Sequence, residues 1–150
     1  MLEIQPATED DLDDVLPLFA GYQVFYRGEQ QPDDKNRAFL RRFVTGEAGR
    51  LLLARDGETG EALGLANLYW TWSSTLAEEQ VLLNDLFVSE NARGRDVGHA
   101  LIEASRAVAR ERGSRTLCWV TDLTNRKAQR LYERFDAERN TTFEYDLDAR

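Results

Sequence analysis

Apolar positions recur along this chain with two different periods. Four segments place an apolar residue every three or four positions, the spacing of an amphipathic helix. The predicted helices are 12–26, 39–44, 97–112 and 125–135. Other segments are continuously apolar or alternate between apolar and polar residues, which is typical of strands. The predicted strands are 2–5, 51–55, 62–72, 81–88, 116–120 and 141–147. The resulting order, βααβββαβαβ, predicts a mixed α/β fold.

Local signals support several of these boundaries. Thr8 and Asp11 have the spacing of a capping box at the start of the first helix. Pro32 breaks the chain before the second helix, and Gly113 is the expected C-cap of the third. The sequence contains no repeat, linker or low-complexity tract. At 150 residues it is long enough to bury a real core, and we expect residues 1–150 to form a single domain.

The segment from the strand at 81–88 to the helix at 97–112 indicates an anion site. The strand leads through Ser89 into a turn that contains Arg93, Gly94, Arg95 and Gly98. The first N–H groups of a helix have no intrahelical partner, and they lie at its positive end. Two arginines beside such a turn suit a phosphate ligand. The residues alone therefore predict a diphosphate site here, although a tight connection would use similar residues.

Two motifs carry a resemblance to a known family. The loop reads R-x-x-D-x-G at 93–98, and a later block reads N-x-x-A-x-x-L-Y-E at 125–133. Together they resemble the acetyl-CoA loop and the fourth helix of the GNAT superfamily of N-acetyltransferases. The segment Leu-Asn-Asp-Leu-Phe at 83–87, with Ser73 and Ser74 before it, resembles a bacterial branch that acetylates small amines and diamines. The resemblance extends over nearly the whole chain.

The resemblance implies a GNAT-like fold with acetyl-CoA as co-substrate. That fold has a central, mostly antiparallel, twisted sheet whose fourth and fifth strands splay apart, flanked by about four helices. The fourth strand would carry a bulge, and its exposed backbone would pair with the pantetheine arm. The implied cofactor-binding residues are Leu86, Phe87, Val88, Arg93, Gly94, Arg95, Asp96, Val97, Gly98 and Asn125.

Asp96 departs from the family pattern, Arg/Gln-x-x-Gly-x-Gly/Ala, because it replaces the middle glycine. A carboxylate near the diphosphate repels it, and the Cβ atom narrows the approach of the ligand. Aspartate still adopts left-handed backbone angles at modest cost. We therefore expect Asp96 to weaken CoA binding without abolishing it. Alternatively, Asp96 points to solvent or caps the following helix.

The candidate catalytic residues are Tyr132 and Asp85. Tyr132 matches the family tyrosine that protonates the departing CoA thiolate, although a tyrosine on an amphipathic helix often only packs. Asp85 lies in an apolar strand, where a buried polar group needs a partner. It is expected to accept the ammonium proton of the substrate, or else to anchor the substrate or the fold. Asn125 either caps its helix or contacts pantetheine.

The candidate acceptor-binding residues lie on two other segments. Tyr22 and Tyr26 end the first helix, where this fold places part of the acceptor pocket, and either tyrosine could instead pack in the core. Asn84 stands where related polyamine acetyltransferases have glutamate. Glu79 is a further candidate; Glu78 and Asp122 are weaker ones.

Composition narrows the class of partner. The formal net charge of −8 argues against nucleic acid and anionic membranes, and no apolar run is long enough to span a bilayer. One cysteine and one histidine exclude an internal disulfide and predict no metal site. The N-terminus lacks the features of a signal peptide, so we expect a cytoplasmic protein. A homodimer is the expected assembly, although the sequence leaves the oligomeric state open.

The family resemblance implies an N-acetyltransferase that transfers acetyl from acetyl-CoA to a primary amine in a ternary complex. A small cationic amine is the preferred acceptor. The alternatives are a protein lysine or N-terminal acetyltransferase and a non-catalytic acyl-CoA sensor. A Rossmann enzyme ranks lower, because no Gly-x-Gly-x-x-Gly follows the first strand.

Overall fold

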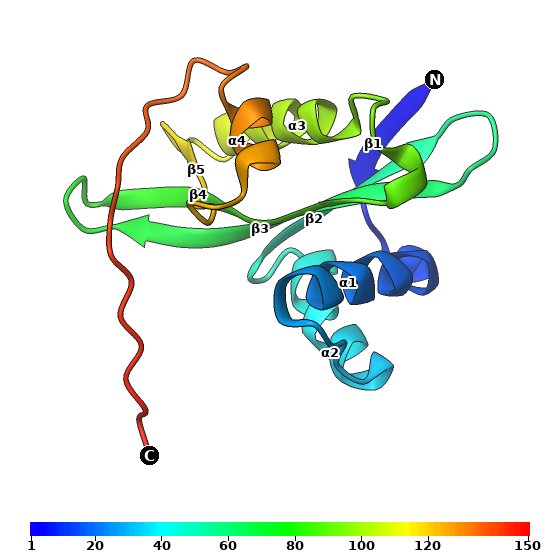
Figure 1. Ribbon diagram of the computed structural model, residues 1–150, viewed down its shortest axis with the longest axis horizontal. Coiled ribbons are helices and arrows are strands. Elements are labelled where there is room, and N and C mark those ends of the chain that lie inside the picture. Colours follow the sequence, from blue (N-terminus) through cyan, green and yellow to red (C-terminus); the bar gives the residue numbers. More distant parts are fainter. The chain divides into compact units, whose positions relative to one another are not determined.

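A computed structural model describes residues 1–150. The chain forms two compact units, Met1–Val120 and Thr121–Arg150. The first unit contains one five-stranded sheet in the order β1-β2-β3-β4-β5 (Figure 1). Its strands are β1 (Leu2–Pro6), β2 (Gly49–Asp56), β3 (Ala62–Ser73), β4 (Glu78–Val88) and β5 (Leu117–Cys118). Neighbours from β1 to β4 are antiparallel, whereas β5 runs parallel to β4. The predicted mixed, mostly antiparallel sheet is confirmed.

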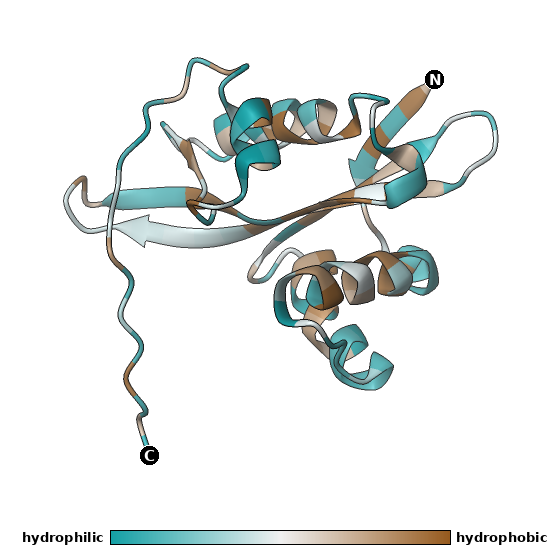
Figure 2. Ribbon diagram, in the orientation of Figure 1, coloured by the Kyte–Doolittle hydropathy of each residue, from teal (hydrophilic) through white to brown (hydrophobic).

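Helices cover both faces of this sheet. They are α1 (Leu12–Arg27), α2 (Asp33–Val44) and α3 (Val97–Glu111). Helices α1 and α2 lie on one face and α3 on the other (Figure 1). Apolar residues are concentrated along the middle of the sheet and on the helices that pack against it (Figure 2). Fully buried leucines such as Leu12, Leu65 and Leu101 each contribute about 1.5–3 kcal/mol to folding.

The helix boundaries in the first unit follow the local signals. Thr8 and Asp11 form the predicted capping box, which begins with a short 3-10 turn, η1 (Glu9–Asp11), before α1. Gly113 follows α3 in the left-handed region, with φ 80°. A second 3-10 turn, η2 (Glu90–Ala92), precedes the loop that leads into α3. None of the helices is both long and apolar enough to cross a membrane.

The second unit differs from the sequence prediction. It contains α4 (Arg126–Tyr132), which is shorter than the predicted helix at 125–135. The predicted strand at 141–147 is wrong, because this segment has no regular structure. Its alternating apolar side chains, Phe143, Tyr145 and Leu147, are 85%, 89% and 94% exposed. Alternation stabilises a strand only where a partner strand and a buried face exist, and this unit of 30 residues supplies neither.

Candidate active site

A bulge in β4 decides which face of the sheet receives Asp85. Asn67 of β3 pairs with Asp85, but the next residue, Leu68, pairs with Leu83, so Asn84 is an extra residue on β4. One inserted residue transfers every following side chain to the opposite face. Leu83 therefore faces the side covered by α3, whereas Asp85 faces α1. The bulge that the family resemblance implied is present.

The carboxylate of Asp85 lies in a buried polar cluster. The residue is only 3% exposed. The side-chain amide of Asn84 donates to its Oδ1 at 2.9 Å, and that of Asn67 donates to its Oδ2 at 3.2 Å. The hydroxyl of Tyr22, on α1, is the third donor. A buried carboxylate is tolerated where donors replace water, and these three come from β4, β3 and α1.

Burial sets the protonation behaviour of this cluster. It raises the pKa of Asp85 above the usual value for aspartate, although the donors Tyr22, Asn84 and Asn67 oppose that shift. Burial, together with the Asp85 charge, also raises the pKa of Tyr22 and of Tyr69. Tyr22 therefore remains a protonated donor at neutral pH. The cluster holds a carboxyl group whose charge depends on keeping its donors.

Aromatic rings connect this cluster to the surface. The ring of Tyr22 lies 6.1 Å from that of Phe19 and 4.8 Å from that of Tyr26. Tyr26 is 49% exposed, and the adjacent Phe25 is 60% exposed. The end of α1 thus presents aromatic side chains to solvent while Tyr22 reaches inward to Asp85. Both predicted acceptor tyrosines lie on the same side of α1, one turn apart.

The pairing of β4 with β5 ends early. Only Val81 and Leu82 pair with β5, opposite Leu117 and Cys118. The rest of β4, including the predicted thioester-binding segment 86–88, has no strand partner on that side. The predicted strand at 116–120 is thereby reduced to two residues. This early end is the splay that the fold class predicted, and it leaves the edge of β4 open to pair with another extended chain.

The loop between η2 and α3 has the backbone geometry of an anion site. Gly94 and Asp96 have φ values of 83° and 63°, both left-handed. The following N–H groups of Val97 and Gly98 begin α3 and precede its first intrahelical bond, from Ala100 to Asp96. Alternating backbone conformations of this kind turn successive N–H groups toward one point. The loop suits a diphosphate.

The side chains of this loop have different roles. Arg93 is exposed, whereas Arg95 donates to Asp56 of β2 at 2.7 Å. Asp96 occupies the N-cap position of α3, but its side chain makes no capping hydrogen bond. The carboxylate of Asp96 therefore does not cap α3 by a hydrogen bond, and a favourable effect of its charge at the positive end of the helix stays a prediction. Its left-handed backbone agrees with the expectation that aspartate can replace glycine there.

Asn125 and Tyr132 belong to the second unit. The side chain of Asn125 accepts from the N–H of Ala128 at 3.3 Å, so it caps α4. Gln129 ties the same helix to the preceding loop by donating to the carbonyl of Leu123 at 3.0 Å. Tyr132 is the last residue of α4 and is partly buried. The capping interpretation of Asn125 is confirmed, and its predicted contact with pantetheine stays a prediction.

The acidic candidates of the first unit, Glu78 and Glu79, are not brought together with Asp85. Glu79 pairs with Arg112 at 3.0 Å, and Glu78 pairs with Arg115 at 3.3 Å. Six residues of strand, about 20 Å, separate Glu79 from Asp85. Asp122, in the second unit, accepts from Thr124. Glu78 and Glu79 already have partners, and they contribute no second charge beside Asp85.

Sequence reasoning missed Asn67, although a signal for it existed. Asn67 is the single strongly polar residue in the apolar run 62–70, and a buried polar side chain needs a partner. It is fully buried, and its amide nitrogen is committed to Asp85. Its Oδ1 accepts no hydrogen bond, which costs about 1–3 kcal/mol. By donating to Oδ2 of Asp85 from β3, Asn67 supports that carboxylate.

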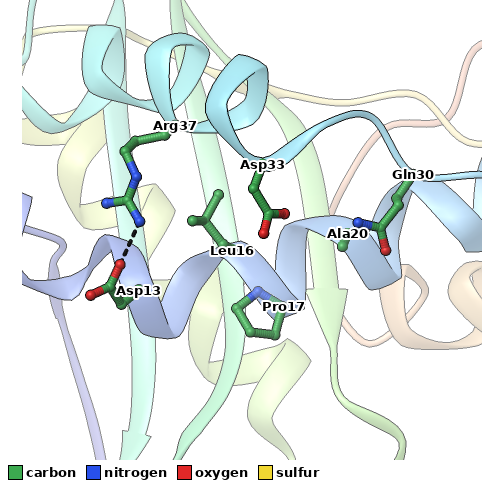
Figure 3. A pocket seen from close by; sticks show the side chains of 7 residues that line it. All are labelled: Asp13, Leu16, Pro17, Ala20, Gln30, Asp33 and Arg37. Carbon is green, nitrogen blue, oxygen red and sulfur yellow. Dashed lines mark hydrogen bonds and ion pairs between the residues drawn. The ribbon is translucent and has the colours of Figure 1, made fainter.

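An open pocket of about 350 Å³ lies between α1 and α2 (Figure 3). Asp13, on α1, forms an ion pair with Arg37, on α2, across it. Helical residues are 100° apart, so Tyr22, nine residues after Asp13, points to the opposite side of α1. The pocket is therefore separate from the Asp85 cluster. Its lining consists of Asp13, Leu16, Pro17, Ala20, Gln30, Asp33 and Arg37.

Comparison with known proteins decides the family. The model of the acetyltransferase (GNAT) family matches residues 13–137. The chain belongs to the GNAT family. This GNAT chain is an acyltransferase, and acetyl-CoA is the co-substrate of its family.

The chain is similar to two curated relatives in sequence and to two solved structures in fold. It is 36% identical to the uncharacterized N-acetyltransferase YhfO of Bacillus subtilis over 143 residues, 95% of this chain and 93% of the relative. It is 38% identical to the D-amino-acid N-acetyltransferase HPA3 of Saccharomyces cerevisiae over 115 residues, 77% and 71% of the two chains. The crystal structure of a probable acetyltransferase has a TM-score of 0.87 at 30% identity, covering 99% and 98%. An aminoglycoside N-acetyltransferase in complex with CoA shares the fold, with a TM-score of 0.85 at 18% identity, covering 99% and 95%.

Asp85→Asn is expected to lower the free energy of unfolding by about 1–3 kcal/mol, because an amide group replaces one acceptor oxygen among three donors. The loss should be larger at pH 4 than at pH 7. A raised folded-state pKa means that the native carboxyl holds its proton more tightly than the unfolded one, so the stability of the unmodified protein falls as pH rises through that pKa. The asparagine variant lacks this dependence.

Urea unfolding at both pH values measures this difference. Asp10→Asn is the control, because Asp10 is exposed and its carboxylate makes no hydrogen bond or ion pair. It should show no comparable pH dependence. A loss that increases from pH 4 to pH 7 would contradict a raised pKa for Asp85.

Proposed function

We propose that this GNAT chain transfers the acetyl group of acetyl-CoA to the primary amine of a small cationic molecule, by direct attack while both substrates are bound. The observation that carries the proposal is the buried Asp85 carboxylate, which the β4 bulge turns toward α1 beside Tyr22. It places a negative charge next to the open edge of β4. A nearby negative charge in a poorly solvated site attracts an ammonium group.

Acetyl-CoA would bind through the loop at 93–98 and the open edge of β4. In this proposal the diphosphate meets Arg93, Arg95 and the first N–H groups of α3. The backbone of Leu86, Phe87 and Val88 pairs with the pantetheine arm, and one N–H in this segment polarises the thioester carbonyl. Proximity and this hydrogen bond would supply most of the rate enhancement. Asn125 would contact the pantetheine arm, as the family resemblance implies.

The acceptor amine would dock beside Asn84, Tyr22 and Tyr26. The side-chain N–H of Asn84 donates a hydrogen bond to Asp85, so the side-chain oxygen of Asn84 is directed away from that carboxylate. The Asn84 side chain is exposed, and its oxygen is an acceptor suited to an ammonium group. The two tyrosines of α1 would surround the aliphatic part of the amine. Glu79, paired with Arg112, has no part in this arrangement.

Proton transfers complete the proposed reaction. The amine must lose a proton before its nitrogen forms the amide bond. Because Asp85 is only 3% exposed, we assign the transfer to Tyr22, which would pass its own hydroxyl proton to Asp85 as it accepts one from the amine. When the thioester carbon–sulfur bond breaks, Tyr132 would donate a proton to the thiolate. A phenol suits this step, because the leaving thiolate is a comparable base. The second proton that the attacking nitrogen loses as the amide forms would restore the Tyr132 phenol.

A second acceptor class has its own support. HPA3, by its name, acetylates D-amino acids, and it is 38% identical to this chain over 115 residues. A D-amino acid has the same primary amine but adds a carboxylate, which the charge on Asp85 would repel. A D-amino acid and a small cationic amine therefore differ by the carboxylate group.

A matched substrate series tests the acceptor class. D-alaninol is expected to have a higher kcat/KM than D-alanine, with a diamine of similar size higher still, since only the net cation is attracted to Asp85. Activity should rise with pH as the amine deprotonates and fall with added salt. Release of free CoA thiol measures turnover. Preference for D-alanine with a flat salt profile would replace the cationic acceptor by an amino acid.

Tyr132→Phe tests the proposed general acid. The substitution removes one hydroxyl and little packing, so CoA affinity should survive while kcat falls by roughly 10²–10⁴-fold. Tyr145→Phe is the control, because Tyr145 is 89% exposed in the same unit. Single-turnover measurements isolate the chemical step. An unchanged single-turnover rate would leave Tyr132 with a packing role only.

Asp96→Gly tests the departure of this loop from its family. The change removes a carboxylate beside the proposed diphosphate position, worth roughly fivefold to tenfold in affinity. It also places glycine at a left-handed φ of 63°, which offsets about 0.5–1 kcal/mol of added backbone entropy in the free loop. Tighter CoA binding at low salt, with a smaller gain at high salt, is expected from calorimetry. Weaker binding at low salt would exclude repulsion by Asp96.

A further inference from the structure

The turn between β2 and β3 is joined to the proposed diphosphate loop by side-chain contacts. Arg95, in the loop, donates to Oδ2 of Asp56 at 2.7 Å. Asn91, in η2, donates to Glu61 at 2.9 Å. Figure 1 shows this turn next to η2, although about 30 residues separate them in sequence. The loop therefore has a neighbour that is not part of its own strand–loop–helix segment.

The carboxylate of Asp56 is held in place by hydrogen bonds from its own turn. Its Oδ1 accepts from the N–H groups of Glu58 and Thr59 at 2.9 and 3.2 Å, so it closes its own turn while Oδ2 holds Arg95. The hydrogen bond from Arg95 lowers the pKa of Asp56 to about 2, so the carboxylate stays ionised at any ordinary assay pH. An ion pair with one anchored partner loses less side-chain entropy than a pair of two mobile side chains.

Arg95 occupies the position where such an anchor has most effect. It lies between Gly94 and Asp96, the two left-handed residues of the loop. Holding its side chain therefore restrains the backbone whose N–H groups would face the diphosphate. A guanidinium has five N–H donors, and Asp56 engages Nη2. The remaining donors are available to a phosphate oxygen at the same time.

We propose that Asp56 is a positioning residue for CoA: through Arg95 it holds the 93–98 loop in the conformation that binds the diphosphate. This inference rests on the proposed function, in which that loop binds CoA. In this proposal the negatively charged Asp56 strengthens the binding of CoA, which is itself an anion. Simple repulsion predicts the opposite sign, because removing a negative charge near a diphosphate should tighten binding.

Two matched substitutions separate these accounts. Asp56→Asn keeps an oxygen that can accept from Glu58 and Thr59, but it removes the ion pair with Arg95. Glu58→Gln, two residues away in the same turn, also removes one negative charge, and the carboxylate of Glu58 makes no hydrogen bond or ion pair. Calorimetry with CoA at low salt gives the affinity of each protein, and thermal unfolding without ligand reports on folding.

Asp56→Asn is expected to weaken CoA binding roughly threefold to fivefold, the range of an exposed ion pair with good geometry. Glu58→Gln should bind CoA as tightly as the unmodified protein or slightly more tightly. In kinetics, Asp56→Asn should raise KM for acetyl-CoA and leave kcat and KM for the amine unchanged. Turnover of S-acetylpantetheine, which has no diphosphate, should be the same for the asparagine variant and the unmodified protein.

Each other outcome overturns a specific statement. Tighter CoA binding by Asp56→Asn, matching Glu58→Gln, would show that Asp56 only repels the ligand. An equal loss with acetyl-CoA and S-acetylpantetheine would show a general structural effect. An additive loss in the Asp56→Asn, Arg95→Ala double variant would show that Asp56 does not act through Arg95. Absence of CoA binding by the unmodified protein would instead remove the proposed function of the loop.

Discussion

The burial of the Asp85 carboxylate constrains how α1, β3 and β4 of the first unit are arranged. The carboxyl group of Asp85 lies inside an apolar sheet-and-helix core, and such a group is tolerated only with several donors around it. Its donors come from β4, β3 and α1, so the cluster fixes the position of α1 on the sheet as well as the bulge. Apolar packing holds α1 against the sheet, while the cluster requires Tyr22 to lie above Asp85.

The bulge also supports the proposal that β4 contacts both substrates. Before Asn84 the strand pairs with β3 on one side, and Val81 and Leu82 also pair with β5 on the other. After it, the strand keeps β3 but has no β5 partner, and it leads directly to the loop that begins α3. One strand thus presents Asp85 on one face, an open backbone edge beside it and the proposed anion-binding loop at its end. In the proposed reaction, acetyl-CoA and the amine would be brought close together because both contact β4.

The sequence was sufficient for features governed by local chemistry. Periodicity located α1, α2, α3 and the four long strands, and the capping box at Thr8 was correct. It failed where tertiary partners decide: the alternation at 141–147 resembles a strand, but Phe143, Tyr145 and Leu147 remain exposed. Asn67 was missed because only the bulge brings it opposite Asp85. Pairing of Arg95 with Asp56 joins residues 39 positions apart, which no local pattern specifies.

An acidic protein that binds a polyanion must rely on local geometry. The net charge of −8 repels CoA at long range, but that field is screened over about 8–10 Å in physiological salt. Inside that distance, the left-handed residues Gly94 and Asp96 and the start of α3 turn backbone dipoles toward one point. Arg95 adds positive charge, and Asp56 neutralises part of it. The partial neutralisation is favourable when a fixed guanidinium binds a phosphate better than a mobile one, because the entropy of ordering the side chain is lost before the ligand arrives.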